Sequence, residues 1–286
     1  MLRQILQALQ LELSHQNVYI ISGDHKIYGA LIMIERGKLV DFLDKTLLLQ
    51  DFPGDYSNNG LQVEGGNEVE KILFAVDACQ EVFDTAVKEK CNFIFVHHGL
   101  SWGGGIKRWT GIDAKRFATL LGNGISLYAA HLPLDAHPVF GNNAVLADMA
   151  ELQERTAFFE YAGSKIGISG TFKTGHTLQQ LAEILGRQLE VEPLLRGDGQ
   201  KIIHRAAIVS GGGGLDSIFA AKAADCDLLI TGEMVHTMHH AALESGVAVI
   251  ALGHYASETT GPLAMQKLIA DTFPVETVFA EVPTGL

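Results

Sequence analysis

FIFVHHGLSW, residues 93–102, joins an apolar run to two adjacent histidines, His97 and His98. A continuous apolar run of this kind is typical of a strand that is buried on both faces, as in a parallel sheet covered by helices. One histidine at the end of such a strand is common and carries little meaning. Two adjacent histidines suggest a metal site, and this hypothesis requires the rest of the chain to supply further ligands.

The order of elements around this strand occurs twice along the chain. In each copy, two helical segments separate three apolar strands. Two copies of one βαβαβ unit predict two related α/β lobes that face each other. The first copy comprises strands at 71–78, 92–96 and 125–131 and helices at 80–91 and 113–124; the second comprises strands at 205–210, 227–231 and 247–254 and helices at 214–226 and 235–246.

The predicted fold class is therefore α/β, with two similar lobes, mostly parallel sheets and a site in the cleft between the lobes. In open parallel sheets, ligands bind beyond the carboxyl ends of the strands. A further amphipathic helix is expected at 39–50. We divide the chain into an N-terminal extension of unassigned role at 1–38, a first lobe at 39–151 and a second lobe at 152–286.

Three regions at the lobe boundaries carry less specific predictions. Two short strands are expected around the turn residues Gly23 and Asp24 of the extension. The segment 152–204, with a helix at 178–189, is expected to join the lobes. The C-terminal end is a candidate to pack back on the first lobe.

The 286-residue chain has the composition of a folded globular protein, with 47% hydrophobic and 19% charged residues. A formal net charge of −12 argues against general binding of nucleic acid or of anionic membranes. The chain has no apolar run long enough to cross a bilayer, and its start does not resemble a signal peptide. Cys79, Cys91 and Cys226 form no close pair, so we expect reduced thiols and a cytoplasmic location.

Metal-binding side chains follow three of the predicted strands. They are His97 and His98 after one strand, Asp135 after the next, and His254 with Glu258 after the last. Consecutive residues of a strand point to opposite faces, so His97 and His98 can serve two different ions. Imidazoles and carboxylates together suit zinc, iron, manganese, cobalt or nickel better than calcium or magnesium. We therefore expect two divalent transition-metal ions per chain, with water completing their coordination.

Each of these residues also has an ordinary structural interpretation. His97 and His98 can be plain strand-end residues, Asp135 a turn residue, and Glu258 a favourable acid at the start of a helix. Taken alone, the structural interpretation is the better one for Asp135 and for Glu258. Only the combined set favours a metal site.

Five motifs occur in a characteristic order: SNNGLQVEG, FVHHGLSW, HLPLDAHPVFGNN, TGE and GHYASE. Together they resemble the NIF-three-like dinuclear metal proteins, a family also named GTP cyclohydrolase I type 2 homologues, from residue 39 to the C-terminus. The resemblance implies the NIF-three-like fold, with the metals in the cleft between its lobes. It also implies a ring-shaped (toroidal) homohexamer.

The resemblance also implies a ligand arrangement. His98 and Asp135 would hold one ion, His97 and His254 would hold the other, and Glu258 would bridge the two.

Further residues are candidates to support the metal ligands or to face the substrate, although surface roles are open for each. They are His131, Glu233, His240, Lys107 and Arg108. His236 and His240 lie four residues apart in a predicted helix, where exposed histidines are commoner than a metal pair. The run SGGGG at 210–214 is either a tight strand-to-helix turn or a loop that cradles phosphate.

Two classes of function fit these features. In the first, the protein is a metal-dependent hydrolase of cyclohydrolase or phosphoesterase type, in which metal-bound water attacks an anionic small molecule such as a nucleotide and no separate catalytic side chain is assigned. In the second, it is a metal-binding regulatory or interaction protein without turnover. The coordination of the metals distinguishes the two classes of function. A structural metal site is closed by protein ligands, whereas a catalytic site keeps an open position.

Overall fold

The structure is a computed structural model that describes residues 33–286. The two strands predicted around Gly23 and Asp24 lie outside the described residues. Strand β1 (Ile34–Glu35) pairs with β3 (Glu68–Val69). Helix α2 (Arg36–Leu47) follows at once and begins three residues before the boundary predicted at residue 39.

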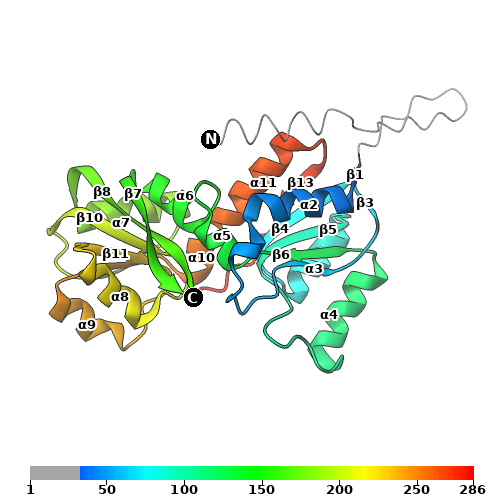
Figure 1. Ribbon diagram of the computed structural model, residues 1–286, viewed down its shortest axis with the longest axis horizontal. Helices are drawn as coiled ribbons and strands as arrows, with labels where there is room; N and C mark the ends of the chain where they lie inside the picture. Colours follow the sequence, from blue (N-terminus) through cyan, green and yellow to red (C-terminus); the bar gives the residue numbers. More distant parts are fainter. Residues whose placement is uncertain (1–32) are drawn as a thin grey trace, which may run out of the picture.

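The first lobe is built on a five-stranded sheet with the order β13-β4-β5-β6-β2 (Figure 1). Strands β13, β4, β5 and β6 are parallel, and β2 is antiparallel at the edge. The C-terminal strand thus returns to the first sheet. The bounds are β2 (Gly60–Val63), β4 (Lys71–Asp77), β5 (Phe93–His98), β6 (Ser126–Ala129) and β13 (Glu276–Phe279).

Helices cover both faces of this sheet. Phe93 and Phe95 of β5 pack in the core cluster beneath α2 and α11 (Thr260–Thr272). Ile94 and Val96 pack in the cluster on the other face, with α3 (Gln80–Lys88) and α4 (Gly111–Gly122). The strand ends with His97 and His98, whose ring centroids lie 4.5 Å apart.

The second lobe is built on a six-stranded sheet with the order β7-β8-β10-β11-β12-β9. The three central strands are parallel, whereas β7, β8 and β9 pair antiparallel at the edges. The prediction of mostly parallel sheets thus holds for the strands at the centre of each lobe. The bounds are β7 (Gln153–Tyr161), β8 (Ser164–Thr177), β9 (Leu194–Arg196), β10 (Ile202–Val209), β11 (Leu228–Thr231) and β12 (Ala248–Ala251).

The segment predicted only to join the lobes forms a large part of this sheet. It contains the long β7–β8 hairpin, β9 and helix α7 (Leu178–Leu189). Thr177 caps α7: its hydroxyl accepts from the Gln180 amide while the Gln180 side chain accepts from the Thr177 amide. Helices α8 (Gly214–Ala223) and α9 (Met238–Ser245) cover the opposite face from α7.

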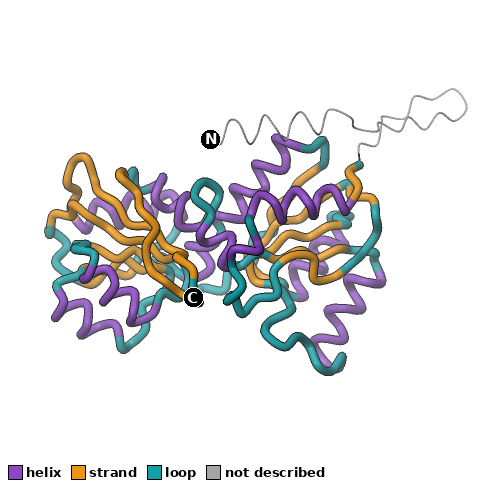
Figure 2. Tube along the Cα trace, viewed as in Figure 1, coloured by secondary structure: helices purple, strands orange, loops and turns teal. Residues whose placement is uncertain are grey.

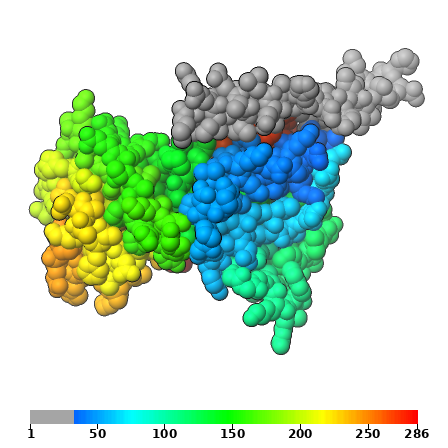
Figure 3. Space-filling view, viewed as in Figure 1, coloured from blue at the N-terminus to red at the C-terminus, as the bar shows by residue number. Residues whose placement is uncertain are grey.

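Three short helices lie where the lobes meet (Figures 1 and 2). They are α5 (Leu132–Ala136), α6 (Asn142–Met149) and α10 (His254–Glu258). The short 3-10 helix Leu49–Asp51 follows α2, and the Ser164 hydroxyl of the hairpin donates to the carbonyl of Asp51 at 3.3 Å. Figure 3 shows green residues of the middle of the chain lying against blue residues of the first lobe.

None of the described helices is long and apolar enough to cross a membrane. Cys79, Cys91 and Cys226 are free thiols, in agreement with the prediction from their spacing.

Candidate metal centre

Strand β5 ends with two histidines, His97 and His98. His97 is fully buried, and its Nδ1 lies 2.9 Å from the carbonyl oxygen of Ala130. His98 is half-buried, and its Nδ1 lies 2.8 Å from Asp77 Oδ1. The rings diverge with their centroids 4.5 Å apart.

His131, two residues after the end of β6, places a third imidazole beside those of His97 and His98. Its Nδ1 lies 2.8 Å from Asp55 Oδ1, and its amide donates to the side chain of Asn59. Burial alone would raise the pKa of Asp55, but the hydrogen bond and positive charge of His131 outweigh it and lower that pKa. A ligand atom of His131 lies within 4.8 Å of ligand atoms of His97 and His98, so His131 is itself a candidate ligand.

Helix α10 contributes His254 and Glu258, four residues apart on one helix face. Nδ1 of His254 lies 2.6 Å from Glu233 Oε1, so Glu233 supports His254 from the end of β11. Nε2 of His254 lies 3.1 Å from Glu258 Oε2. The carboxylate of Glu258 thus lies at the centre of the cluster, and the residue is only 4% exposed.

All four imidazoles share one arrangement. In each, Nδ1 bonds to a carbonyl or carboxylate oxygen behind the ring. In the neutral ring such a partner fixes the tautomer with the proton on Nδ1, so that Nε2 is the nitrogen that can ligate a metal. This is the arrangement that histidine ligands of metals use.

Asp135 completes the set of candidate ligands and is held from both lobes. Its Oδ1 accepts from Asn142 Nδ2 at 2.9 Å and from Ser210 Oγ at 3.0 Å. The same Oδ1 lies 3.7 Å from His97 Nε2, so the two bonds hold it in place toward the cluster. Asn143, also fully buried, donates to the Asp135 carbonyl and accepts from the Ser210 amide.

The ligand atoms form two groups that share Glu258. One group is His97, Asp135 and Glu258, and the other is His98, His254 and Glu258. Glu258 Oε1 lies 3.5 Å from His97 Nε2, and Oε2 lies 3.3 Å from His98 Nε2. Glu258 thus lies between the two groups, where the resemblance implies a bridging ligand. The resemblance pairs His98 with Asp135 and His97 with His254, whereas these groups place His97 with Asp135 and His98 with His254.

Two buried atoms of this cluster have no hydrogen-bond partner among the described residues: His97 Nε2 and Glu258 Oε2. Burial alone would lower the pKa of His97, but the Asp135 and Glu258 carboxylates raise it to about 10. Burial alone would raise the pKa of Glu258, but the neighbouring histidines lower it strongly. The cluster therefore attracts positive charge, and divalent cations would satisfy both atoms, so the residues fit a metal centre.

The glycine run at 210–214 packs against these ligands. Gly211 has φ +59°, and a Cβ there would collide with Glu258 Oε1. Only glycine allows this approach. The run thus serves as a tight strand-to-helix turn, one of the two interpretations that the sequence left open.

A pocket of about 410 Å³ opens beside the cluster. His98, His131 and His254 form one side of it with Asp135 and Glu258. Its volume falls in the range of small-molecule sites, so the ligand set remains accessible to a substrate.

Three of the further predicted residues lie away from the cluster. His240 lies on α9 beside His239, and His236 lies in the turn before α9 rather than in the helix. Lys107 and Arg108 are exposed in the loop before α4. No hydrogen bond or ion pair seen within residues 33–286 connects any of these to the metal ligands.

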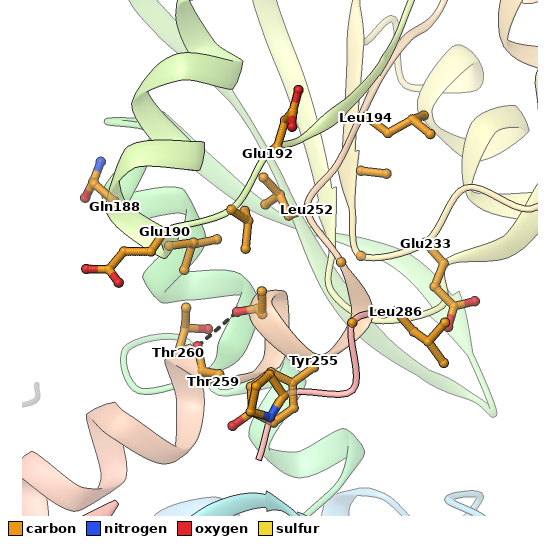
Figure 4. A pocket seen from close by; sticks show the side chains of 18 of the residues that line it. Gln188, Glu190, Glu192, Leu194, Glu233, Leu252, Tyr255, Thr259, Thr260 and Leu286 are labelled. Carbon is orange, nitrogen blue, oxygen red and sulfur yellow. Dashed lines mark hydrogen bonds between the residues drawn. The ribbon is translucent and has the colours of Figure 1, made fainter. Parts of the chain in front are cut away.

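A second, larger cavity of about 1110 Å³ is lined in part by residues of α10 and of the C-terminal segment (Figure 4). Glu233 is at its edge, and Tyr255 and Leu286 line it. The Tyr255 hydroxyl donates to Glu281 and accepts from the Val282 amide, so the C-terminal segment is bound to the helix that carries two candidate ligands.

Comparison with known proteins gives consistent results. A family model described as Duf34/NIF3 (NGG1p interacting factor 3) matches residues 34–284, which begins five residues before the limit expected from the motifs. The GTP cyclohydrolase 1 type 2 homolog of Pyrococcus abyssi is 44% identical over 254 residues, with 88% of this chain and 100% of the relative covered.

Solved structures show the same fold. The protein TTHA1606 from Thermus thermophilus has a TM-score of 0.80 and 39% identity, with 88% of this chain and 100% of that chain covered. A structural-genomics protein of unknown function, ybgI, has a TM-score of 0.82 and 33% identity over the same shares. The chain described here therefore belongs to the Duf34/NIF3 family.

Proposed function

We propose that this protein is a dinuclear metal-dependent hydrolase that acts on an anionic small molecule of the nucleotide or phosphoester type. The observation that carries the proposal is the central position of Glu258, which is shared by two groups of candidate ligands beside an open pocket. Two metal ions held a few ångströms apart are a common arrangement in hydrolytic enzymes.

The ligand atoms suggest how two ions would be held. One ion would bind His97, Asp135 and one oxygen of Glu258, and the other would bind His98, His254 and the second oxygen. His131 would complete one of the two coordination shells. The metals suited to such imidazole and carboxylate sets are zinc, iron, manganese, cobalt and nickel.

When bound, divalent cations supply Lewis acidity, which makes water more acidic and stabilises negative charge that develops on the substrate. The protein's own residues hold the geometry for that chemistry. The buried carboxylates of Asp135 and Glu258 would offset two of the four positive charges of two divalent ions. The carboxylates that hold the imidazoles would offset more; they are Asp55, Asp77 and Glu233. An anionic substrate would therefore be attracted by the ions themselves and not by a net positive charge of the site.

The names of the relatives support a nucleotide substrate only in part. Several are called GTP cyclohydrolase 1 type 2 homolog. A shared fold and ligand set do not fix the substrate, so cyclohydrolase and phosphoesterase chemistry are both within the proposal.

The test is a screen of the purified, metal-loaded protein against nucleotides and phosphoesters, with Glu258→Gln as the matched control. We expect turnover by the wild type and a loss of at least ~10²-fold in the variant, because the variant keeps the shape of the side chain and removes its charge. A protein that binds two ions and turns over nothing in the screen would instead support the regulatory alternative. The expected homohexamer and cytoplasmic location remain proposals, and light scattering tests the first.

A further inference from the structure

The pocket beside the metal centre has walls of different chemistry. Metal ligands line one side, and residues of the glycine run with the start of α8 line another. A third wall comes from β7 of the long hairpin, which presents Phe159 and Tyr161. A ligand that fills this pocket meets all three walls at once.

The aromatic wall is built with unusual backbone geometry. Phe159 has φ +54°, a conformation that bulky residues rarely adopt, and strain of this kind is concentrated at functional sites. Its half-buried ring packs near Phe158. Tyr161 is 53% exposed although it lines the pocket, so its ring is available to a ligand.

The hairpin is also attached to the opposite lobe. Its tip, at Ala162, packs so closely on Gly54 that a Cβ at Gly54 would collide with the Ala162 carbonyl oxygen. Ser164 donates to Asp51 of the first lobe, as described above. Asp55, four residues after Asp51, supports His131. The aromatic wall is therefore held in a fixed position relative to the metal ligands.

The wall formed by α8 differs in charge. The amides of Gly212 and Gly213 make no hydrogen bond to the main chain of the described residues. However, Asp216 lies in the first turn of α8 and also lines the pocket. Its carboxylate already occupies the favourable position at the helix N-terminus and would repel an anion there. The anionic group of a ligand is therefore expected at the wall formed by the metal ligands and not at the start of α8.

We propose that this pocket selects phosphate monoesters whose alcohol carries a flat aromatic ring. The phosphate faces the metal ligands, and the ring packs on Phe159 and Tyr161. This inference rests on the proposed function and adds the substrate class that the same site favours. Contacts between aromatic rings add to the free energy of burial, so the ring becomes the selected feature of the ligand.

The test measures binding, because hydrolysis would complicate a titration. Calorimetry of the zinc-loaded, full-length protein compares phenylphosphonate with methylphosphonate, which carry the same anionic group and are not hydrolysed at a P–O ester bond. We expect phenylphosphonate to bind about tenfold more tightly to the wild type. We expect the preference for phenylphosphonate over methylphosphonate to fall by several fold in Tyr161→Ala and in Phe159→Leu. In Tyr161→Phe, which keeps the ring, we expect the preference to remain.

Phe219→Ala is the matched control. Phe219 is an aromatic residue of the same lobe, is 53% exposed like Tyr161, and does not line the pocket. Its replacement should leave the preference unchanged. Equal binding of the two phosphonates by the wild type, or a preference that survives both pocket variants, would overturn the inference and leave the hydrolase proposal standing. If neither phosphonate nor inorganic phosphate binds, both proposals fail.

Discussion

The two lobes carry matching structures at the metal centre. In the first lobe, β6 leads into α5 with His131 and Asp135 four residues apart; in the second, β12 leads into α10 with His254 and Glu258 at the same spacing. The internal repeat of the sequence thus extends to the candidate ligands. The comparison shows how one structural unit, used twice, supplies a histidine and a carboxylate from each side of a cleft.

The two carboxylates nevertheless have different environments. Asp135 Oδ1 accepts from Asn142 and Ser210, and its ion-pair contact among the described residues is with His97, at 3.7 Å. Glu258 has one methylene more, and its carboxylate lies within 3.5 Å of the Nε2 atoms of His97, His98 and His254. The comparison teaches that the longer side chain, which reaches three histidines, suits a carboxylate to bridge, whereas its counterpart is suited to terminal ligation.

The largest expected effect tests the difference between Glu258 and Asp135 directly. In Glu258→Gln, both ions should weaken together, because the residue is shared by both ligand groups. In the matched variant Asp135→Asn, only one ion should weaken. Calorimetric metal titration of the two variants side by side measures both. If Glu258→Gln keeps one ion at wild-type affinity, Glu258 is a terminal ligand and a different oxygen forms the bridge.

Gly211→Ala should have the next largest effect. The added Cβ collides with the Glu258 carboxylate, so we expect metal affinity to fall by about 10- to 100-fold, with loss of thermal stability. Gly214→Ala is the matched control, since its φ is also positive but its Cβ would meet nothing within 4 Å. Gly214→Ala should show only the cost of the backbone strain, about 1 kcal/mol. Equal metal affinity in the two variants would contradict the argument.

Replacing the carboxylate that holds a candidate histidine ligand tests whether the two lobes contribute equivalent ligands. Glu233→Gln should reduce metal affinity by about tenfold, because Glu233 holds the ring of His254. Asp55→Asn should do the same through His131, the corresponding histidine of the first lobe. If Asp55→Asn leaves both ions unchanged while Glu233→Gln does not, His131 is no ligand and the correspondence between the lobes ends at the fold.

The smallest expected effect is the pH dependence of the thermal stability of the metal-free protein. The pKa of His97 is raised to about 10 and that of His254 to about 9, above the ordinary 6.5. A raised pKa stabilises the folded state fully below pH 6.5, and this contribution is lost as pH rises through 9 to 10. We therefore expect the Tm of chelator-treated protein to fall between about pH 7 and about pH 10.

Glu258→Gln again provides the control, since it removes a charge that raises both pKa values. Its Tm should vary less over the same pH interval. Thermal unfolding followed by circular dichroism measures both proteins, and parallel curves would show that these histidines do not cause the dependence.

The sequence predicted those parts of the site that follow from strand periodicity. The apolar run at 93–96 required a buried strand, and the sequence then placed His97 and His98 together at its carboxyl end. The role of His131 was harder to predict, because a histidine beside a turn is usually structural. The internal repeat indicates a ligand role for His131, because His131 and Asp135 have the same spacing as His254 and Glu258. The motifs predict both members of the second pair as ligands, but only Asp135 of the first pair.

Other features depend on contacts that no local pattern reveals. Strand β7, QERTAFFEY, is mostly exposed and polar, so its sequence lacks the apolar alternation that marks a half-buried strand. The supporting bonds of Asp55 and Ser210 join residues far apart in the chain. Which histidine pairs with which carboxylate depends on small differences in distance, and these follow from packing alone.

The position of β13 has a consequence for biosynthesis. This strand pairs with β4 at the edge of the first sheet, yet it is made after the whole second lobe. During translation, His97, His98 and Asp135 leave the ribosome well before His254 and Glu258, so a nascent chain carries only part of its metal site for much of its synthesis. The first lobe cannot acquire its final strand, nor the site its shared carboxylate, until the C-terminal segment has emerged, and co-translational folding of the two lobes is thereby coupled.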